Sequence, residues 1–175
     1  MNTFESMKKS SYRSILSIVF LLSTINAQYL HVVGKEVFDN TGEKIILKGM
    51  GLGGWLVPEG YMLGTWGSPT SIRNRITDLI GEDSTEVFYE KFEKNYVAEE
   101  DINQLAEWGF NSVRLPFHYK TLSPTYGSFN EKGFSVIDSV IAWCSRNEIY
   151  LILDMHVAPG SQSGDENADG DEGAK

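Results

Sequence analysis

The sequence predicts an α/β fold built on a parallel β-sheet, and three observations lead to this prediction. Amphipathic helical segments alternate with short apolar strands, which is the pattern of βα units. Residues 150–157 are strongly apolar, as strands covered on both faces of a parallel sheet are. Arg114 and His156 lie at the carboxyl ends of two successive strands, where barrels keep their active sites. The alternation fits a barrel or an open sheet, and these polar residues favour a barrel.

The composition fits one globular domain and excludes several other classes. The chain has 175 residues, of which 12% are aromatic, with one cysteine and a formal net charge of −9. These values exclude collagen-like, disulfide-framework and disordered chains. An acidic chain attracts neither phosphate backbones nor anionic lipid surfaces, so we expect no nucleic acid and no membrane as partners of the mature chain.

Residues 1–27 are expected to be a secretory signal peptide. Three basic residues precede an apolar run at 15–22, and the small residue Ala27 suits cleavage. The run is short for a bilayer span, and an uncleaved anchor is the alternative. We therefore expect a secreted protein, extracellular or periplasmic, whose mature domain is residues 28–175 and begins at Gln28.

Short strands and a long loop are expected after the signal. Strands at 30–33 and 36–38 form an N-terminal β-hairpin, and the turn at 39–42 leads into the apolar run 45–47. We expect that run to be the first core strand. Residues 49–67 are rich in glycine and aromatic residues without periodicity, which is typical of an ordered functional loop.

Three amphipathic helices are expected before the next strand. The first begins after Ser68 and ends at Gly81, the second is capped by Ser84, and the third runs from about Ala98 to Gly109. Apolar residues at helical spacing are Ile72, Ile76, Leu79 and Ile80 in the first helix, Val87, Phe88 and Phe92 in the second, and Ile102, Leu105 and Ala106 in the third.

A strand at 110–116, a helix at 130–147 and a strand at 150–157 complete the pattern. Asn130 can cap the start of the helix, and Cys144 lies on its apolar face. We expect Cys144 to be a small buried hydrophobe rather than a reactive thiol.

Strand alternation groups polar side chains. Arg114 shares one face of its strand with Ser112, and Asp154 and His156 share one face of the next strand. These three charged or titratable groups can satisfy one another, so the pattern fits a structural ion-pair network as well as a functional site.

Three blocks of residues, at 51–56, 111–116 and 154–162, together resemble glycoside hydrolase family 5, and in particular its cellulase-like and exo-1,3-β-glucanase-like branch. The resemblance covers residues 29–175. It implies a (β/α)8 TIM barrel, of which this chain holds about the first three strands. It also implies retaining hydrolysis of O-glycosyl bonds in β-glucans, so the expected partner is a β-glucan or a related oligosaccharide. No cofactor is expected.

The resemblance also implies roles for individual residues. Arg114 and His156 would support catalysis around the sugar that is cleaved, by orienting a carboxylate and by holding a hydroxyl. The implied substrate-binding residues are Trp55, Glu59, Gln162, Glu166 and Asn167.

The two catalytic glutamates of the family have no counterpart up to residue 175. A retaining mechanism needs an acid/base carboxyl and a nucleophilic carboxylate roughly 5 Å apart. Glu59 and Asp154 do not take these roles, so we expect the chain alone to be inactive. Its third strand would leave an open apolar edge, from which we expect non-specific self-association.

Two other classes of function stay open. A non-catalytic carbohydrate-binding protein would use Trp55, Tyr61 and Trp66 as stacking platforms.

A calcium-stabilised structural domain is the other class. Asp165, Asn167 and Asp169 match the first, third and fifth positions of a calcium loop, but its twelfth position has no counterpart in the chain. The three histidines have no zinc-like spacing. We therefore expect no metal site.

Overall fold

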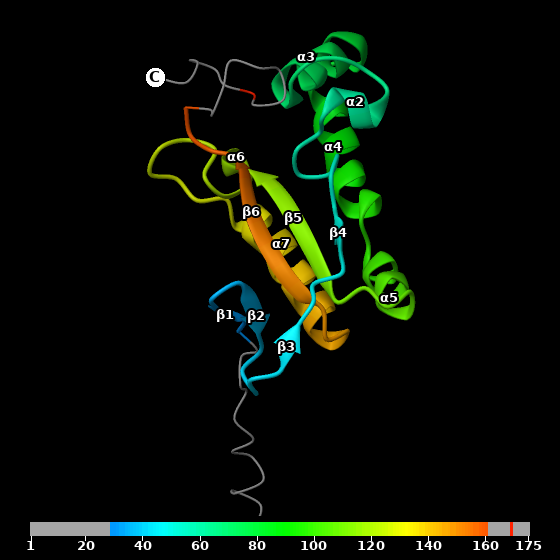
Figure 1. The fold of residues 1–175 in the computed structure, drawn as a ribbon. Helices are drawn as coiled ribbons and strands as arrows, with labels where there is room; N and C mark the ends of the chain where they lie inside the picture. The colour runs from blue at the N-terminus through cyan, green and yellow to red at the C-terminus, as the bar shows by residue number, and fades with distance from the viewer. Residues whose placement is uncertain (1–28, 161–168, 170–175) are drawn as a thin grey trace, which may run out of the picture. The chain divides into compact units, whose positions relative to one another are not determined.

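The computed structural model describes residues 29–160 and residue 169, so the expected signal peptide lies outside the described residues. The chain divides into two compact units, Met1–Ile46 and Leu47–Lys175. The first unit holds a three-stranded antiparallel sheet. Its strands are β1 (His31–Val33), β2 (Glu36–Phe38) and β3 (Lys44–Ile45), in that order (Figure 1). The predicted N-terminal hairpin is therefore confirmed.

The apolar run at 45–47 is not the first core strand, which corrects our expectation. Ile45 ends β3, and Ile46 is 70% exposed. The first strand of the second unit is instead β4 (Gly49–Gly51), which lies in the segment expected to be a loop. A Cβ atom on Gly49 would lie 2.6 Å from the Ser112 Oγ, so the strand needs a glycine where it pairs closely with its neighbour. A Gly-Met-Gly strand carries no apolar alternation that a sequence analysis could detect.

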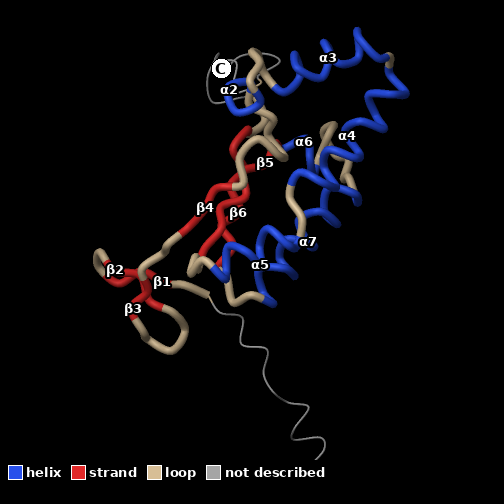
Figure 2. The backbone as a smooth tube through the Cα atoms, turned by 90° about the vertical axis from the view of Figure 1, so that its right-hand side faces the viewer, coloured by secondary structure: helices blue, strands red, loops and turns tan. Residues whose placement is uncertain are grey.

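The second unit is built on a parallel sheet with strand order β4-β5-β6. Strand β6 (Tyr150–Val157) has the predicted bounds. Strand β5 (Ser112–His118) begins and ends two residues later than predicted, so Arg114 lies in its first half and not at its carboxyl end, which corrects our expectation. The prediction of a parallel α/β sheet is confirmed. The two strands run side by side in both views (Figures 1 and 2), with Arg114 in register with Ile152.

The helices of the second unit are α2 (Gly60–Leu63), α3 (Pro69–Ile80), α4 (Glu82–Tyr96), α5 (Glu99–Glu107), α6 (Tyr119–Leu122) and α7 (Glu131–Arg146). Helices α3, α5 and α7 agree with the predictions, and α4 has a shifted start. The short helix α2, in the segment expected to be a loop, and the short helix α6 were not predicted. The Ser68 side chain accepts a hydrogen bond from the Ser71 N–H and so caps α3, as predicted. Helix α4 begins after Gly81 rather than at Ser84, because Gly81 takes a positive φ of 81° that redirects the chain there. Among the described residues, no helix combines the length and the apolar character that crossing a membrane requires.

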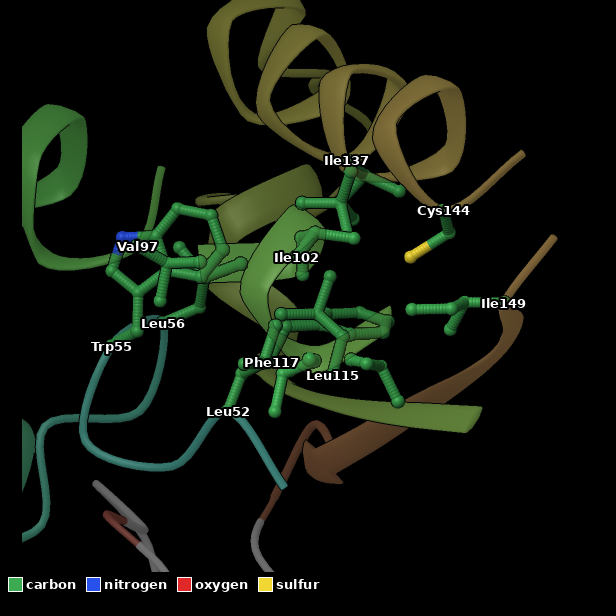
Figure 3. Close-up of a cluster of buried hydrophobic side chains, with 13 residues drawn as sticks. Leu52, Trp55, Leu56, Val97, Ile102, Leu115, Phe117, Ile137, Cys144 and Ile149 are labelled. Atoms are coloured by element: carbon green, nitrogen blue, oxygen red, sulfur yellow. The ribbon is translucent and has the colours of Figure 1, made fainter. Parts of the chain in front are cut away.

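The core lies between one face of the sheet and the helices α5 and α7. Val113 and Leu115 of β5 are fully buried, and they cluster with Ile102 of α5 and Val140 of α7. Figure 3 shows Leu115 and Ile102 in this cluster. Strand alternation therefore directs the apolar side chains of β5 to the helices. The opposite face of β5 is left to carry Arg114.

Cys144 is 1% exposed in this core, as expected, and burial raises the pKa of its thiol to about 11. Because the thiolate is the reactive form, we expect the folded chain to resist an aromatic disulfide reagent at mildly alkaline pH. The same chain in denaturant should release one equivalent of the coloured thiolate. Rapid reaction of the native chain would contradict the buried position.

Candidate functional site

Strands β5 and β6 bring Arg114, Asp154 and His156 into contact. The Arg114 Nη2 donates to the Asp154 Oδ2 and lies 3.0 Å from the His156 Nδ1. The same Nδ1 lies 3.1 Å from the Asp154 Oδ2. The side chains are between 28% and 45% exposed, so the group is accessible to a ligand. We call these three residues the Arg114 cluster.

The geometry of the Arg114 cluster suits the binding of a polar ligand. Asp154 balances the guanidinium charge, and both side-chain contacts that Arg114 makes with described residues use Nη2. The planar fork therefore keeps further N–H groups that could orient a carboxylate or a hydroxyl. A neutral His156 ring can accept from Arg114 or donate to Asp154 through Nδ1, and its tautomer decides which.

Glu59 is a buried carboxylate on the loop that follows β4. It is 8% exposed, and the Tyr61 hydroxyl lies 3.5 Å from its Oε2. Its backbone carbonyl accepts from the N–H groups of Met62 and Leu63 at the start of α2. These bonds hold the backbone of Glu59 at the start of α2.

Trp55 lies in the core and not on a surface where it could bind substrate, which corrects our expectation. The ring is 2% exposed, packs in the core with Leu52 and Leu56, and donates from Nε1 to the Glu93 carbonyl at 2.8 Å (Figure 3). A buried indole offers no face to a sugar, so the expectation that Trp55 is a stacking platform is wrong. Tyr61 and Trp66, by contrast, are 69% and 81% exposed.

A second polar cluster, which the sequence did not reveal, joins segments far apart in the chain. Asp169 is 7% exposed; its Oδ1 accepts from the Thr70 N–H at 3.1 Å, and its Oδ2 accepts from the Thr70 hydroxyl at 2.8 Å. The His118 Nε2 lies 3.1 Å from the same Oδ2. Because the His118 Nδ1 accepts from the Lys120 N–H, the proton of a neutral ring is on Nε2, which donates to Asp169. The Ser68 side chain also forms a hydrogen bond with Asp169. We call Ser68, Thr70, His118 and Asp169 the Asp169 clasp.

The electrostatics of the Asp169 clasp favour a charged carboxylate. Burial acts to raise the pKa of Asp169, but hydrogen bonds from His118, Ser68 and Thr70 outweigh it and hold the pKa well below its usual range. Thr70 lies in the first turn of α3, where a negative charge also meets the positive end of the helix dipole.

The Asp169 clasp bears on the calcium hypothesis. Both carboxylate oxygens of Asp169 already accept hydrogen bonds from protein donors. Among the described residues, no group of three or more His, Cys, Asp or Glu side chains could hold a metal ion. Asp165 lies outside the described residues, as do the expected substrate-binding residues Gln162, Glu166 and Asn167.

A cavity of about 370 Å³ borders the Asp169 clasp but not the Arg114 cluster. Two ion pairs lie in its lining, because Arg73 bridges to Glu86 and the Lys132 Nζ lies 3.6 Å from the Glu93 Oε2. We therefore place the candidate site at the Arg114 cluster, on chemical grounds.

Comparison with known proteins gives a family match and several relatives. The family model described as Cellulase (glycosyl hydrolase family 5) matches residues 73–174. A β-xylosidase of Phanerodontia chrysosporium is 35% identical over 143 residues, which cover 81% of this chain and 30% of the relative. A probable glucan 1,3-β-glucosidase A of Aspergillus clavatus is 28% identical, over 70% of this chain and 31% of the relative. The chain thus spans about a third of the length of these curated relatives.

Solved structures show the same fold. The rutinosidase of Aspergillus niger superposes with a TM-score of 0.57 and 17% sequence identity, over 72% of this chain and 37% of the rutinosidase chain. Identity at this level supports the fold alone. The described α/β unit therefore corresponds to part of a TIM barrel, as predicted.

Proposed function

Because the chain belongs to glycosyl hydrolase family 5, we propose that it forms a substrate-positioning part of a retaining glycosidase that acts on β-glucans. The observation that carries the proposal is the Arg114 cluster, in which Arg114, from the first half of β5, contacts Asp154 and His156 in the carboxyl-terminal half of the adjacent parallel strand β6. This is the end of the sheet at which TIM barrels bind their substrates.

Each residue of the site has a distinct proposed task. The Arg114 guanidinium orients a nucleophilic carboxylate and favours its charged form. The His156 ring holds a sugar hydroxyl, and Asp154 fixes both side chains. Glu59 binds hydroxyls from the loop after β4, and we propose the same task for Gln162, Glu166 and Asn167.

Among the described residues, no two carboxyls are arranged as the acid/base and the nucleophile of a retaining mechanism. Asp154 is engaged by Arg114 and His156, and Glu59 is a buried carboxylate beside Tyr61. No contact between described residues pairs Glu59 with Asp154 as an acid and a nucleophile. We therefore propose that residues 28–175 bind gluco-oligosaccharides without cleaving them. From the signal peptide expected at residues 1–27, we also propose that the protein is exported.

Substitution of Arg114 by lysine tests the proposal. Lysine keeps the positive charge but does not reproduce the contacts of the guanidinium with Asp154 and His156, so the His156 ring should hold a sugar hydroxyl less well. Arg114→Lys should therefore weaken the binding of β-linked gluco-oligosaccharides about tenfold with little change in melting temperature. Saturation-transfer NMR measures the binding, and a reducing-sugar assay should detect no hydrolysis by either chain.

The matched control is Arg146→Lys, because Arg146 is another half-exposed arginine paired with an acid, Glu99. This variant should bind like the unsubstituted chain. Equal losses in both variants would indicate that Arg114 belongs to a structural ion-pair network. A fall in the melting temperature of Arg114→Lys large enough to explain the lost binding would also indicate a structural role for Arg114.

A non-catalytic carbohydrate-binding protein is the second candidate function. The exposed rings of Tyr61 and Trp66 favour it, because a ring free on its face can stack on a sugar. The hydrolysis assay separates the two functions when it is applied to the natural protein that contains this sequence. Turnover supports the glycosidase, and binding without turnover supports the carbohydrate-binding protein.

A further inference from the structure

We propose that Trp66 stacks on a sugar unit of a glucan beyond the unit held at the Arg114 cluster, and that Arg75 is the residue that positions it. This inference rests on the proposed function and deepens it, because it makes the ligand a glucan chain of several units rather than a single glycoside.

The first observation is the exposure of the ring. Trp66 is 81% exposed, whereas Trp55 is 2% exposed. Leaving a large aromatic ring in water forgoes the stabilisation that burying it would bring. Single exposed apolar side chains are common on protein surfaces, so exposure alone does not define a site. Trp66 is a stronger case than exposure alone would make it, because the backbone of its loop is held by several hydrogen bonds.

The second observation is that the loop carrying Trp66 is tied down at several points. The Arg75 Nη2 donates to the Trp66 carbonyl and lies 3.2 Å from the Thr65 Oγ1. The Thr65 N–H donates to the Gly60 carbonyl at 2.9 Å. A Cβ atom on Gly60 would lie 2.9 Å from the Thr65 carbonyl oxygen and 2.9 Å from the Trp66 carbonyl carbon. The backbone at Thr65 and Trp66 therefore packs directly against Gly60. The backbone is therefore fixed while the indole stays free.

The third observation places this loop at the carboxyl end of the sheet. Ser68 and Thr70 follow Trp66 closely, and both belong to the Asp169 clasp. The clasp bonds them, through Asp169, to His118, which is the last residue of β5. His118 is in register with Val157, which follows His156 of the Arg114 cluster on β6. His156 and the loop that carries Trp66 therefore belong to the carboxyl end of the parallel sheet.

The chemistry of a held, exposed indole favours a sugar as the occupant. The flat face of a β-linked glucose presents C–H groups to the ring, and its hydroxyls remain in water at the rim. A neutral ligand is also compatible with the acidic chain, which carries a formal net charge of −9. An aromatic ring fixed before binding loses little conformational freedom when the sugar arrives, so its contribution to affinity is larger.

The test compares Trp66→Ala with Trp108→Ala, which removes another exposed indole. Trp108 is 67% exposed at the end of α5, before β5 begins, and so lies toward the amino ends of the strands. We expect Trp66→Ala to weaken the binding of a β-1,3-linked glucohexaose about three- to tenfold and to leave binding of the disaccharide unchanged. Trp108→Ala should bind both ligands like the unsubstituted chain. Saturation-transfer NMR measures both affinities.

Two variants of Arg75 test the positioning role. Arg75→Ala should weaken hexaose binding while Trp66 is still present, and Arg75→Lys should restore part of the affinity, because an ammonium group can also donate to the Trp66 carbonyl. Equal hexaose affinities for Trp66→Ala and Trp108→Ala would overturn the inference, with the proposed function intact. Equal losses for the disaccharide and the hexaose would also overturn it. No binding of any gluco-oligosaccharide by the unsubstituted chain would overturn the proposed function and this inference together.

Discussion

Replacing Asp169 by asparagine is expected to lower the free energy of unfolding by about 2 to 3 kcal/mol, because the buried donors around it lose a charged acceptor. The carboxylate accepts from the Thr70 N–H, the Thr70 hydroxyl and the His118 Nε2. An asparagine side chain presents one oxygen and one NH2 group, so it leaves at least one of these donors facing another donor. Urea unfolding followed by circular dichroism measures the loss.

The same variant should change how stability depends on acid. The pKa of Asp169 is lowered in the folded state, so its contribution to stability is fully present above the pKa of an unfolded aspartate, about 3.9. That contribution is lost as the pH falls toward the folded pKa. We therefore expect unfolding curves of the two chains to differ most near neutral pH and to converge as the pH falls below about 4.

Asp138→Asn is the matched control for this prediction. Asp138 is an exposed aspartate on α7, outside the Asp169 clasp, and its substitution should change the free energy of unfolding by less than about 0.5 kcal/mol. Equal stability of the two variants at neutral pH would show that the clasp does not stabilise the fold. A difference that persisted unchanged in acid would show that the charge of Asp169 is not the cause.

The elements that the sequence predicts well are those whose signals are local. Strand β6 is one unbroken apolar run, and α7 has both its periodic apolar face and flanking asparagines at Asn130 and Asn147. Strand β4 could not be predicted, because the need for glycine in its Gly-Met-Gly sequence comes from close pairing with Ser112, which lies 63 residues after Gly49. The start of α4 was misplaced because a glycine with positive φ replaced the expected serine cap.

The candidate site shows the same division. The grouping of Arg114, Asp154 and His156 could be predicted because side chains alternate along strands. The register could not, because Arg114 pairs with Ile152 and contacts Asp154 from an earlier level of the sheet. The Asp169 clasp was missed because Thr70 and Asp169 are 99 positions apart and no local pattern connects them. The position of Trp55 also depends on a residue far away in the sequence. An indole in a glycine-rich loop can face the solvent or the core, and the hydrogen bond from Trp55 to the Glu93 carbonyl holds it in the core.

The open edge of β6 leads to the last prediction, which concerns association. Strand β6 pairs with β5 on one side, and no strand among the described residues pairs with its other side. Three apolar side chains of this strand, Ile152, Leu153 and Met155, are 44%, 49% and 46% exposed. Unpaired backbone groups beside apolar surface promote edge-to-edge association. We expect residues 28–175 to form oligomers whose size grows with protein concentration, measured by size-exclusion chromatography with light scattering.

A lysine on this edge should prevent the association, because a strand that pairs across it would have to bury the charge. Leu153→Lys is therefore expected to shift the chain toward a monomer, with an unchanged circular dichroism spectrum. The control is Leu79→Lys, which adds the same charge at an 83% exposed leucine on α3. If both lysines dispersed the oligomers equally, net charge rather than the β6 edge would be the cause. A monomeric unsubstituted chain at all concentrations would show that the edge does not associate.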